Sequence, residues 1–183
     1  MTGDFGTAAW SPDGRQIVFS AARTKTEPQH LYVINADGSG LTGITAGDAF
    51  EHEAVWSPDG EWIAYHHSCQ VWLVRPDGAD AHPILKEPEA KFCTEIPSWS
   101  PDSQRLVVIS MGRDQPASLW SVNRDGSNPH PIFELGHLAL FGHARWSPDG
   151  RQIAWEASTG GLAQHWLIDV AGGYAQRLAG FPY

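Results

Sequence analysis

Positive charge is scarce in this chain of 183 residues: 12 lysines and arginines stand against 21 aspartates and glutamates, for a formal net charge of −9. Such a chain has no basic stripe to neutralise a phosphate backbone, so we expect no nucleic-acid partner. Apolar runs of about 18 residues, which a membrane-spanning helix needs, are also lacking, and we expect no membrane partner. The opening residues MTGDFGTAAWSPDG lack the regions of a signal peptide, which leaves the periplasm and the cytoplasm both open.

Familiar catalytic signatures are lacking as well. The sequence contains no Gly-x-Ser-x-Gly elbow, no phosphate-binding glycine loop and no His-Glu-x-x-His pair. These absences favour a non-catalytic protein over an enzyme, although an acid–base site needs no such motif. Helical periodicity is almost absent too, whereas the length is sufficient for a sizeable folded core.

In place of these features the sequence has an internal repeat. The peptide Trp-Ser-Pro-Asp begins at Trp10, Trp56, Trp99 and Trp146, and glycine follows it in every copy except the third. Successive copies are 46, 43 and 47 residues apart. This spacing is typical of β-propeller blades rather than of helical solenoids.

Each repeat also contains a regular series of expected strands. Alternating apolar residues follow the first turn (RQIVFS, EWIAYHH, QRLVVIS and RQIAWEA), and a second strand ends at a further turn (NADG, RPDG, NRDG and VAGG). With the lead-in to the tryptophan and a short closing strand, each unit has four strands. We therefore predict a single all-β propeller domain, residues 1–183, of four four-stranded antiparallel blades. The blades are expected at about 1–47, 48–90, 91–137 and 138–183.

The repeated turn has an architectural explanation. Proline presets φ at the first corner, aspartate suits the second, and glycine takes the left-handed position. Ser103 replaces the glycine in the third copy, and a positive φ there would cost about 1 kcal/mol. The tryptophan before each turn is large enough to fill the wedge between neighbouring blades.

These residues resemble the TolB-type β-propeller repeat, which is related in shape to the WD-repeat class. The resemblance rests on AWSPDGRQIVFS followed by HLYVINADGSGLTGIT, and it extends over four copies in register. It implies a propeller fold, a bacterial source and a tendency to bind other molecules, with no reaction attached. Such repeats are found in periplasmic scaffold proteins and in propeller domains attached to serine peptidases.

The number of copies departs from that family, whose propellers usually have six or more blades. Four blades can close into a ring alone, two chains can join into an eight-bladed ring, or the chain can be a segment of a larger propeller. We favour the homodimer, because closed symmetric assemblies are the common oligomers.

Candidate binding residues lie in the connectors between blades. Variable loops and connectors share the end of a blade opposite to the repeated turns, and binding residues concentrate in such loops. At this end, called the loop end below, we expect Glu51, His52, Glu53, Glu95 and His143. His52 and Glu95 each stand four residues before the tryptophan of their repeat, whereas His143 stands three residues before Trp146. A difference of one residue along a strand points the side chain to the opposite side. A divalent metal would therefore be held by His52 and Glu95, against the alternative of a hydrated polar rim without a cofactor.

The two cysteines fall at the same end of the blades. Cys69 lies in the short loop of the second blade, and Cys93 lies in the connector that leaves it. A disulfide between Cys69 and Cys93 and two unpaired thiols are both compatible with the sequence.

Together these features favour a non-catalytic binding or scaffold module whose loop end engages a protein, a peptide or a carbohydrate. The alternative from another class is a small hydrolase or lyase with an acid–base or metal site at the same end. Its nearest acid–base set is Glu53 with His52 and Glu95.

Overall fold

The structure is a computed structural model that describes residues 5–85, 93–111, 118–134, 143–159, 162–171 and 174–178. Within these ranges, the side chains of residues 5, 6, 93–96, 111, 157–159 and 162–164 lie outside the description. Every regular element in the described ranges is a β-strand. Accordingly, this part of the chain contains no helix long and apolar enough to cross a membrane.

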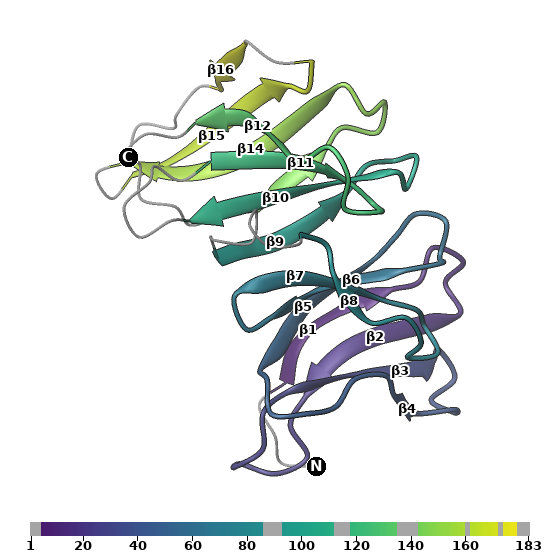
Figure 1. Ribbon diagram of the computed structural model, residues 1–183. Helices are drawn as coiled ribbons and strands as arrows, with labels where there is room; N and C mark the ends of the chain where they lie inside the picture. The colour runs from purple at the N-terminus through teal and green to yellow at the C-terminus, as the bar shows by residue number, and fades with distance from the viewer. Residues whose placement is uncertain are drawn as a thin grey trace. The chain divides into compact units, whose positions relative to one another are not determined.

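The strands form four antiparallel sheets of four strands each (Figure 1). The first sheet contains β1 (Phe5–Trp10), β2 (Gln16–Ala21), β3 (His30–Asn35) and β4 (Thr42–Gly43). The second contains β5 (Glu51–Trp56), β6 (Ile63–His67), β7 (Gln70–Val74) and β8 (His82–Pro83). The third contains β9 (Cys93–Trp99), β10 (Arg105–Met111), β11 (Ser118–Asn123) and β12 (His130–Glu134). The fourth contains β13 (Ala144–Trp146), β14 (Gln152–Thr159), β15 (Leu162–Asp169) and β16 (Ala175–Arg177). The predicted four-stranded blades are confirmed.

The blades belong to two compact units, Met1–Ile84 and Leu85–Tyr183, each of which contains two blades. In the first unit β1 packs against β5, and in the second β9 packs against β13. Each unit has its own apolar core, formed where its two sheets face each other. The first core contains Val18, Leu31, Val33, Ile44, Ala54, Trp56, Ile63, Tyr65 and Val74. The second contains Val107, Ile109, Leu119, Ala144, Ile153, Trp155 and Ile168.

The tryptophans before the repeated turns contribute unequally to these cores. Trp56 is 9% exposed and belongs to the core of the first unit. Trp146 packs on the core of the second unit and donates its indole N–H to the backbone oxygen of Ser98 in the adjacent blade, at 3.1 Å. Trp10, in β1, is 60% exposed. Trp56 and Trp146 thus pack between the two blades of their own unit, as expected, and Trp99 is also buried, at 7% exposed.

The repeated turn satisfies its own polar groups in all four copies. Each serine hydroxyl donates to the aspartate carboxylate two residues later, at 2.5–2.7 Å. The carboxylate also accepts the backbone N–H two residues further on, at 3.0–3.1 Å. These bonds, the serine hydroxyl first, lower the pKa of Asp13, Asp102 and Asp149. Ser103 has a φ of 60°, the left-handed conformation that Gly14, Gly60 and Gly150 take in the other copies. The turn is architectural, because its polar groups are occupied within the turn itself.

A β-bulge interrupts the first strand of the second blade near the loop end. In β5 the register shifts between His52 and Val55, so that two residues lie opposite one, and Glu53 within the shift has a φ of 56°. The register of β9 shifts in the same way directly after Glu95. His52 and Glu95 therefore occupy equivalent positions in their blades, as expected. A bulge of this kind redirects the side chains around it.

Candidate functional site

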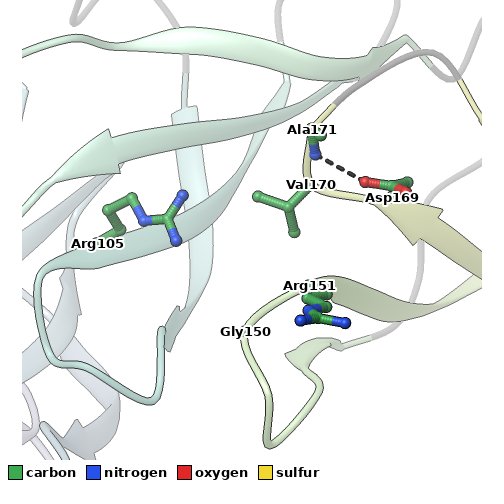
Figure 2. A pocket seen from close by; sticks show the side chains of 6 residues that line it. All are labelled: Arg105, Gly150, Arg151, Asp169, Val170 and Ala171. Carbon is green, nitrogen blue, oxygen red and sulfur yellow. Dashed lines mark hydrogen bonds between the residues drawn. The ribbon is translucent and has the colours of Figure 1, made fainter.

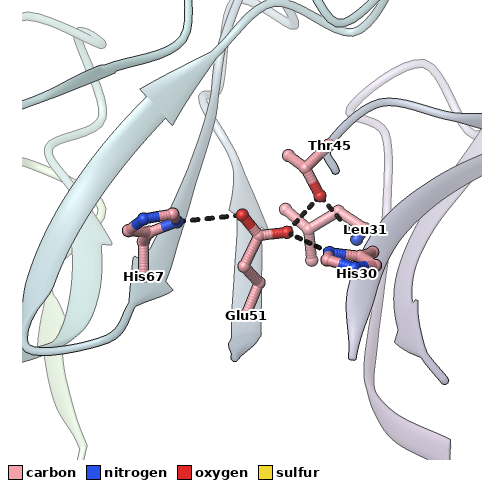
Figure 3. A network of polar contacts seen from close by, with 5 residues as sticks. All are labelled: His30, Leu31, Thr45, Glu51 and His67. Carbon is pink, nitrogen blue, oxygen red and sulfur yellow. Dashed lines mark hydrogen bonds and ion pairs between the residues drawn. The ribbon is translucent and has the colours of Figure 1, made fainter. Parts of the chain in front are cut away.

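A buried carboxylate lies at the loop end of the first unit (Figure 3). Glu51 is 1% exposed. Its Oε1 lies 2.9 Å from Nδ1 of His67, and its Oε2 lies 3.2 Å from Nδ1 of His30. The hydroxyl of Thr45 donates to the same Oε2, and it accepts the backbone N–H of Leu31 at 2.9 Å. Both carboxylate oxygens are thus hydrogen-bonded, which burial of a charged group requires.

Two blades build this site. His30 begins β3 in the first blade, whereas Glu51 and His67 are directly paired residues of β5 and β6 in the second. The connector between the blades supplies Thr45. The backbone N–H of Glu51 donates to the carbonyl of Gln29 at 3.0 Å, which fixes the start of β5 against the first blade. The site therefore forms only when the two blades are packed together.

Each imidazole keeps one nitrogen for another partner. In the tautomer in which Nδ1 donates to Glu51, Nε2 carries the lone pair and can accept a hydrogen bond. The side chains of His30 and His67 are 15% and 25% exposed, so both rings are partly open to solvent. The ring of Trp72 lies 4.4 Å from that of His67 and restricts its rotation. Burial, and next the Glu51 carboxylate, raises the pKa of the Tyr65 hydroxyl, which stays protonated.

A second histidine pair lies on the same two strands. The rings of His52 and His66 stack with centroids 4.5 Å apart. His66 is 7% exposed, and neither ring nitrogen has a hydrogen-bond partner in the described part of the chain. Burial, followed by the charges of His52 and His67, lowers the pKa of His66 to about 4, so this ring is neutral at physiological pH. His52 is more exposed: it lies 3.8 Å from the Glu53 carboxylate and against the ring of Phe50.

The structure places the five predicted binding residues in different settings. Glu51, His52 and Glu53 lie together in β5, at the loop end of the first unit. Glu95 lies in β9, with its side chain outside the described residues, and His143 is an exposed residue directly before β13. A shared site and a metal held by His52 and Glu95 stay predictions. Across the described residues, no group of three or more histidine, cysteine, aspartate or glutamate side chains is arranged to hold a metal ion.

Three members of the Glu51 site, His30, Thr45 and His67, are not among the five predicted binding residues. The signal for His30 is its place at the start of the strand HLYVIN, which puts it at the loop end of the first blade. Its contact with Glu51 crosses from one blade to the next, and periodicity within a blade cannot show such a contact. Thr45 is one of several polar residues in its connector, and nothing in the sequence distinguishes it.

Cys69 lies in the turn between β6 and β7 and is disulfide-bonded. The side chain of Cys93 lies outside the described residues. The pairing of Cys69 with Cys93 therefore stays a prediction.

Four antiparallel four-stranded blades define this chain as a β-propeller protein, and solved structures share the fold. A structure assigned as TolB from Agrobacterium tumefaciens matches 100% of this chain and 64% of its own, with a TM-score of 0.78 and 22% identity. An oligogalacturonate lyase from Vibrio parahaemolyticus matches 96% of this chain and 54% of its own, with a TM-score of 0.76 and 15% identity. At such identities the likeness establishes the fold alone.

Sequence relatives give the type of repeat. An uncharacterised protein of Agrobacterium fabrum is 28% identical over 158 residues, which are 80% of this chain and 52% of that protein. The Tol-Pal system protein TolB of Anaeromyxobacter dehalogenans is 33% identical over 106 residues, 58% of this chain and 23% of its own. No family model matches the chain. The chain is thus similar to TolB-type β-propeller proteins in fold and in repeat, and it spans about half the length of the Agrobacterium fabrum relative.

Proposed function

We propose that this chain is a non-catalytic binding module, and that its loop end holds a ligand through the imidazoles that Glu51 orients. The observation that carries the proposal is the buried Glu51 carboxylate with an imidazole on each oxygen. A carboxylate held in this way fixes the ring orientation and the tautomer of both histidines. The two Nε2 atoms then become acceptors of fixed direction, which is a requirement of specific recognition rather than of folding.

The surroundings of the site support a ligand that has both polar groups and apolar faces. Phe50, directly before β5, is 49% exposed and lies against the half-buried His52. Trp72 adds an aromatic ring beside His67. Exposed aromatic faces next to fixed hydrogen-bond acceptors suit a protein, a peptide or a carbohydrate. The strongly negative net charge of the chain argues against nucleic acid.

One substitution separates ligand binding from stability. In His67→Asn, the side-chain amide can still donate to Glu51 from a position near that of Nδ1, but the outward acceptor is lost. The same reasoning applies to His30→Asn. The matched control is His130→Gln, which changes an exposed histidine of β12 whose Nδ1 lies 2.9 Å from the carbonyl oxygen of Asn128.

The wild-type chain and these variants are screened against a glycan array and a peptide display library. Ligands of the site should bind at least about tenfold more weakly to His67→Asn, as expected for one lost hydrogen bond of about 1.4 kcal/mol. Binding to His130→Gln should be unchanged. If no ligand distinguishes His67→Asn from the control, the loop end of the first unit is not the binding site.

A second candidate function, hydrolysis or elimination, has one observation in its favour. An imidazole whose Nδ1 is held by a buried carboxylate is the arrangement that orients a general base, and His30 and His67 both have it. The lyase of similar fold makes an elimination reaction the first to test. Incubation of each ligand with the wild-type chain, followed by mass spectrometry, decides between the candidates. Products that disappear with His67→Asn would establish an enzyme, and unchanged ligands support the binding module.

A further inference from the structure

A pocket opens at the turn end of the second unit, the end opposite to its variable loops (Figure 2). It has a volume of about 440 Å³ and lies between the third and fourth blades. Arg105 of β10 forms one side, and the other side consists of residues around the turns that follow β13 and β15. Those residues are Gly150, Arg151, Asp169, Val170 and Ala171. The volume falls within the range of ligand sites, about 300–1,000 Å³, and exceeds what a single inorganic anion needs.

The position of Arg105 is fixed before any ligand arrives. Its guanidinium lies over the ring of Trp146, with Cζ 4.9 Å from the ring centroid. Trp146 is itself held by its indole N–H, which donates to the carbonyl of Ser98. The backbone N–H of Arg105 donates to the hydroxyl of Ser100 in the repeated turn, at 2.9 Å. A stacked guanidinium keeps its planar edge free for an oxygen ligand, and little side-chain entropy is left to lose on binding.

The charges of the pocket are not balanced within it. Within the described residues, neither Arg105 nor Arg151 has a carboxylate oxygen within 4 Å. The third charged group, Asp169, already accepts the backbone N–H of Ala171 at 2.8 Å. The carboxylates of Asp102 and Asp149 also interact electrostatically with Arg105 and Arg151, but they belong to the repeated turns and already accept hydrogen bonds there. The lining of the pocket itself therefore has two guanidinium groups and one carboxylate, in a chain whose formal net charge is −9.

The corresponding place in the first unit shows that the repeat does not require this charge. Gln16 stands in the position of the first arginine relative to the repeated turn, and Glu61 stands in the position of the second. The guanidinium of Arg75, in the turn after β7, lies 4.0 Å from the centroid of the Trp62 ring. It is also paired with carboxylates, at 3.5 Å from Glu61 and 3.8 Å from Asp80. Among the described residues, a turn-end pocket lined by two arginines without a carboxylate oxygen within 4 Å is therefore found in the second unit and not at this place in the first.

We propose that this pocket binds the carboxylate side chains of an acidic peptide segment. Arg105 and Arg151 come from two blades and can each take a carboxylate by paired N–H donors. Val170, between them, offers an apolar wall to the methylene groups of a glutamate. This site lies on other blades and at the opposite end of the repeat from Glu51, so it does not rest on the function proposed above.

The test measures binding of a fluorescein-labelled hexaglutamate peptide to the full chain by fluorescence anisotropy. We expect saturable binding that weakens as salt is added, with Kd raised at least about fivefold in Arg105→Gln and in Arg151→Gln. Arg105→Lys keeps the charge but loses the planar fork, and it should bind with intermediate affinity. The matched control is Arg75→Gln, which removes a stacked arginine whose charge is already paired and should leave Kd unchanged.

Several outcomes would overturn the proposal. One is the absence of saturable binding at millimolar peptide, and another is an equal loss of affinity in Arg75→Gln, which would indicate general electrostatic attraction. Binding of inorganic phosphate that hexaglutamate does not displace would assign the pocket to phosphate instead. Urea midpoints of the variants, measured in parallel, show whether Arg105→Gln loses affinity only because it unfolds. His67→Asn should bind hexaglutamate as the wild type does, which separates this proposal from the one on the Glu51 site.

Discussion

Acid should destabilise the first unit through one buried imidazole, that of His66. This ring is 7% exposed, stacks on His52 and has both nitrogens without a hydrogen-bond partner among the described residues. Burial is the first cause that lowers its pKa to about 4, from an ordinary value of 6.5, and repulsion by the neighbouring histidines follows. His66 is therefore much harder to protonate in the folded protein than in the unfolded chain.

The sign and the size of the effect follow from linkage. Above pH 6.5 the ring is neutral in both states, and its contribution to stability is complete. Between pH 6.5 and about 4 the unfolded chain takes up the proton and the folded protein does not, so stability falls as the pH falls. At about 1.4 kcal/mol for each pKa unit, the loss of unfolding free energy over this window amounts to about 3 kcal/mol.

The measurement is urea unfolding, followed by tryptophan fluorescence at a series of pH values from about 7 to about 4, the window in which the two states differ in protonation. His66→Ile removes the titrating ring and introduces the residue found at the equivalent register position of the third blade, Ile109. We expect its unfolding free energy to lose about 3 kcal/mol less than that of the wild type over this window. His130→Gln, which changes an exposed imidazole, should follow the wild type. An equally steep decline in His66→Ile would refute the reasoning.

Four further predictions concern the architecture. Trp56→Ala should lower the unfolding free energy by about 3–5 kcal/mol and Trp10→Ala by much less, because Trp56 is 9% and Trp10 is 60% exposed; equal losses in urea unfolding would show that Trp10 is covered in solution. Gly14→Ala should cost about 1 kcal/mol through its φ of 69° alone, since its Cβ would have no atom within 4 Å; a neutral result would contradict the turn geometry. If Cys69 and Cys93 are paired, thiol titration of the unreduced, unfolded chain should find no free thiol, and two reactive thiols would rule the pair out. Native mass spectrometry should give the mass of two chains if a homodimer completes a ring, and a single-chain mass would contradict the homodimer.

Most of the fold could be predicted because its signals are local. The turn at Ser11 and Asp13 is closed by hydrogen bonds between residues two to five positions apart, so its sequence specifies its shape. Strand alternation and the spacing of the tryptophans then set the number of blades. The register position shared by His52 and Glu95 follows from the same repeat, and the structure confirms it.

The candidate sites were predictable only in part, because their members come from different blades. The sequence directs attention to Glu51 as a polar residue at the loop end, but not to its contact with His30, which is 21 positions away. No sequence pattern distinguishes Arg105 and Arg151 as binding residues, because each is one polar residue shortly after a repeated turn. Their common pocket depends on how the third blade packs against the fourth.

The sequence by itself determined that this protein consists of four antiparallel blades with closed turns at one end and variable loops at the other. Backbone conformation and alternation along a strand depend on near neighbours, and four copies of the same pattern leave little ambiguity. Only the tertiary structure decided which polar groups meet. Glu51 is buried between two imidazoles, and Arg105 and Arg151 line one pocket, because adjacent blades bring distant residues together. A charge acquires its partners and its degree of burial only through that packing.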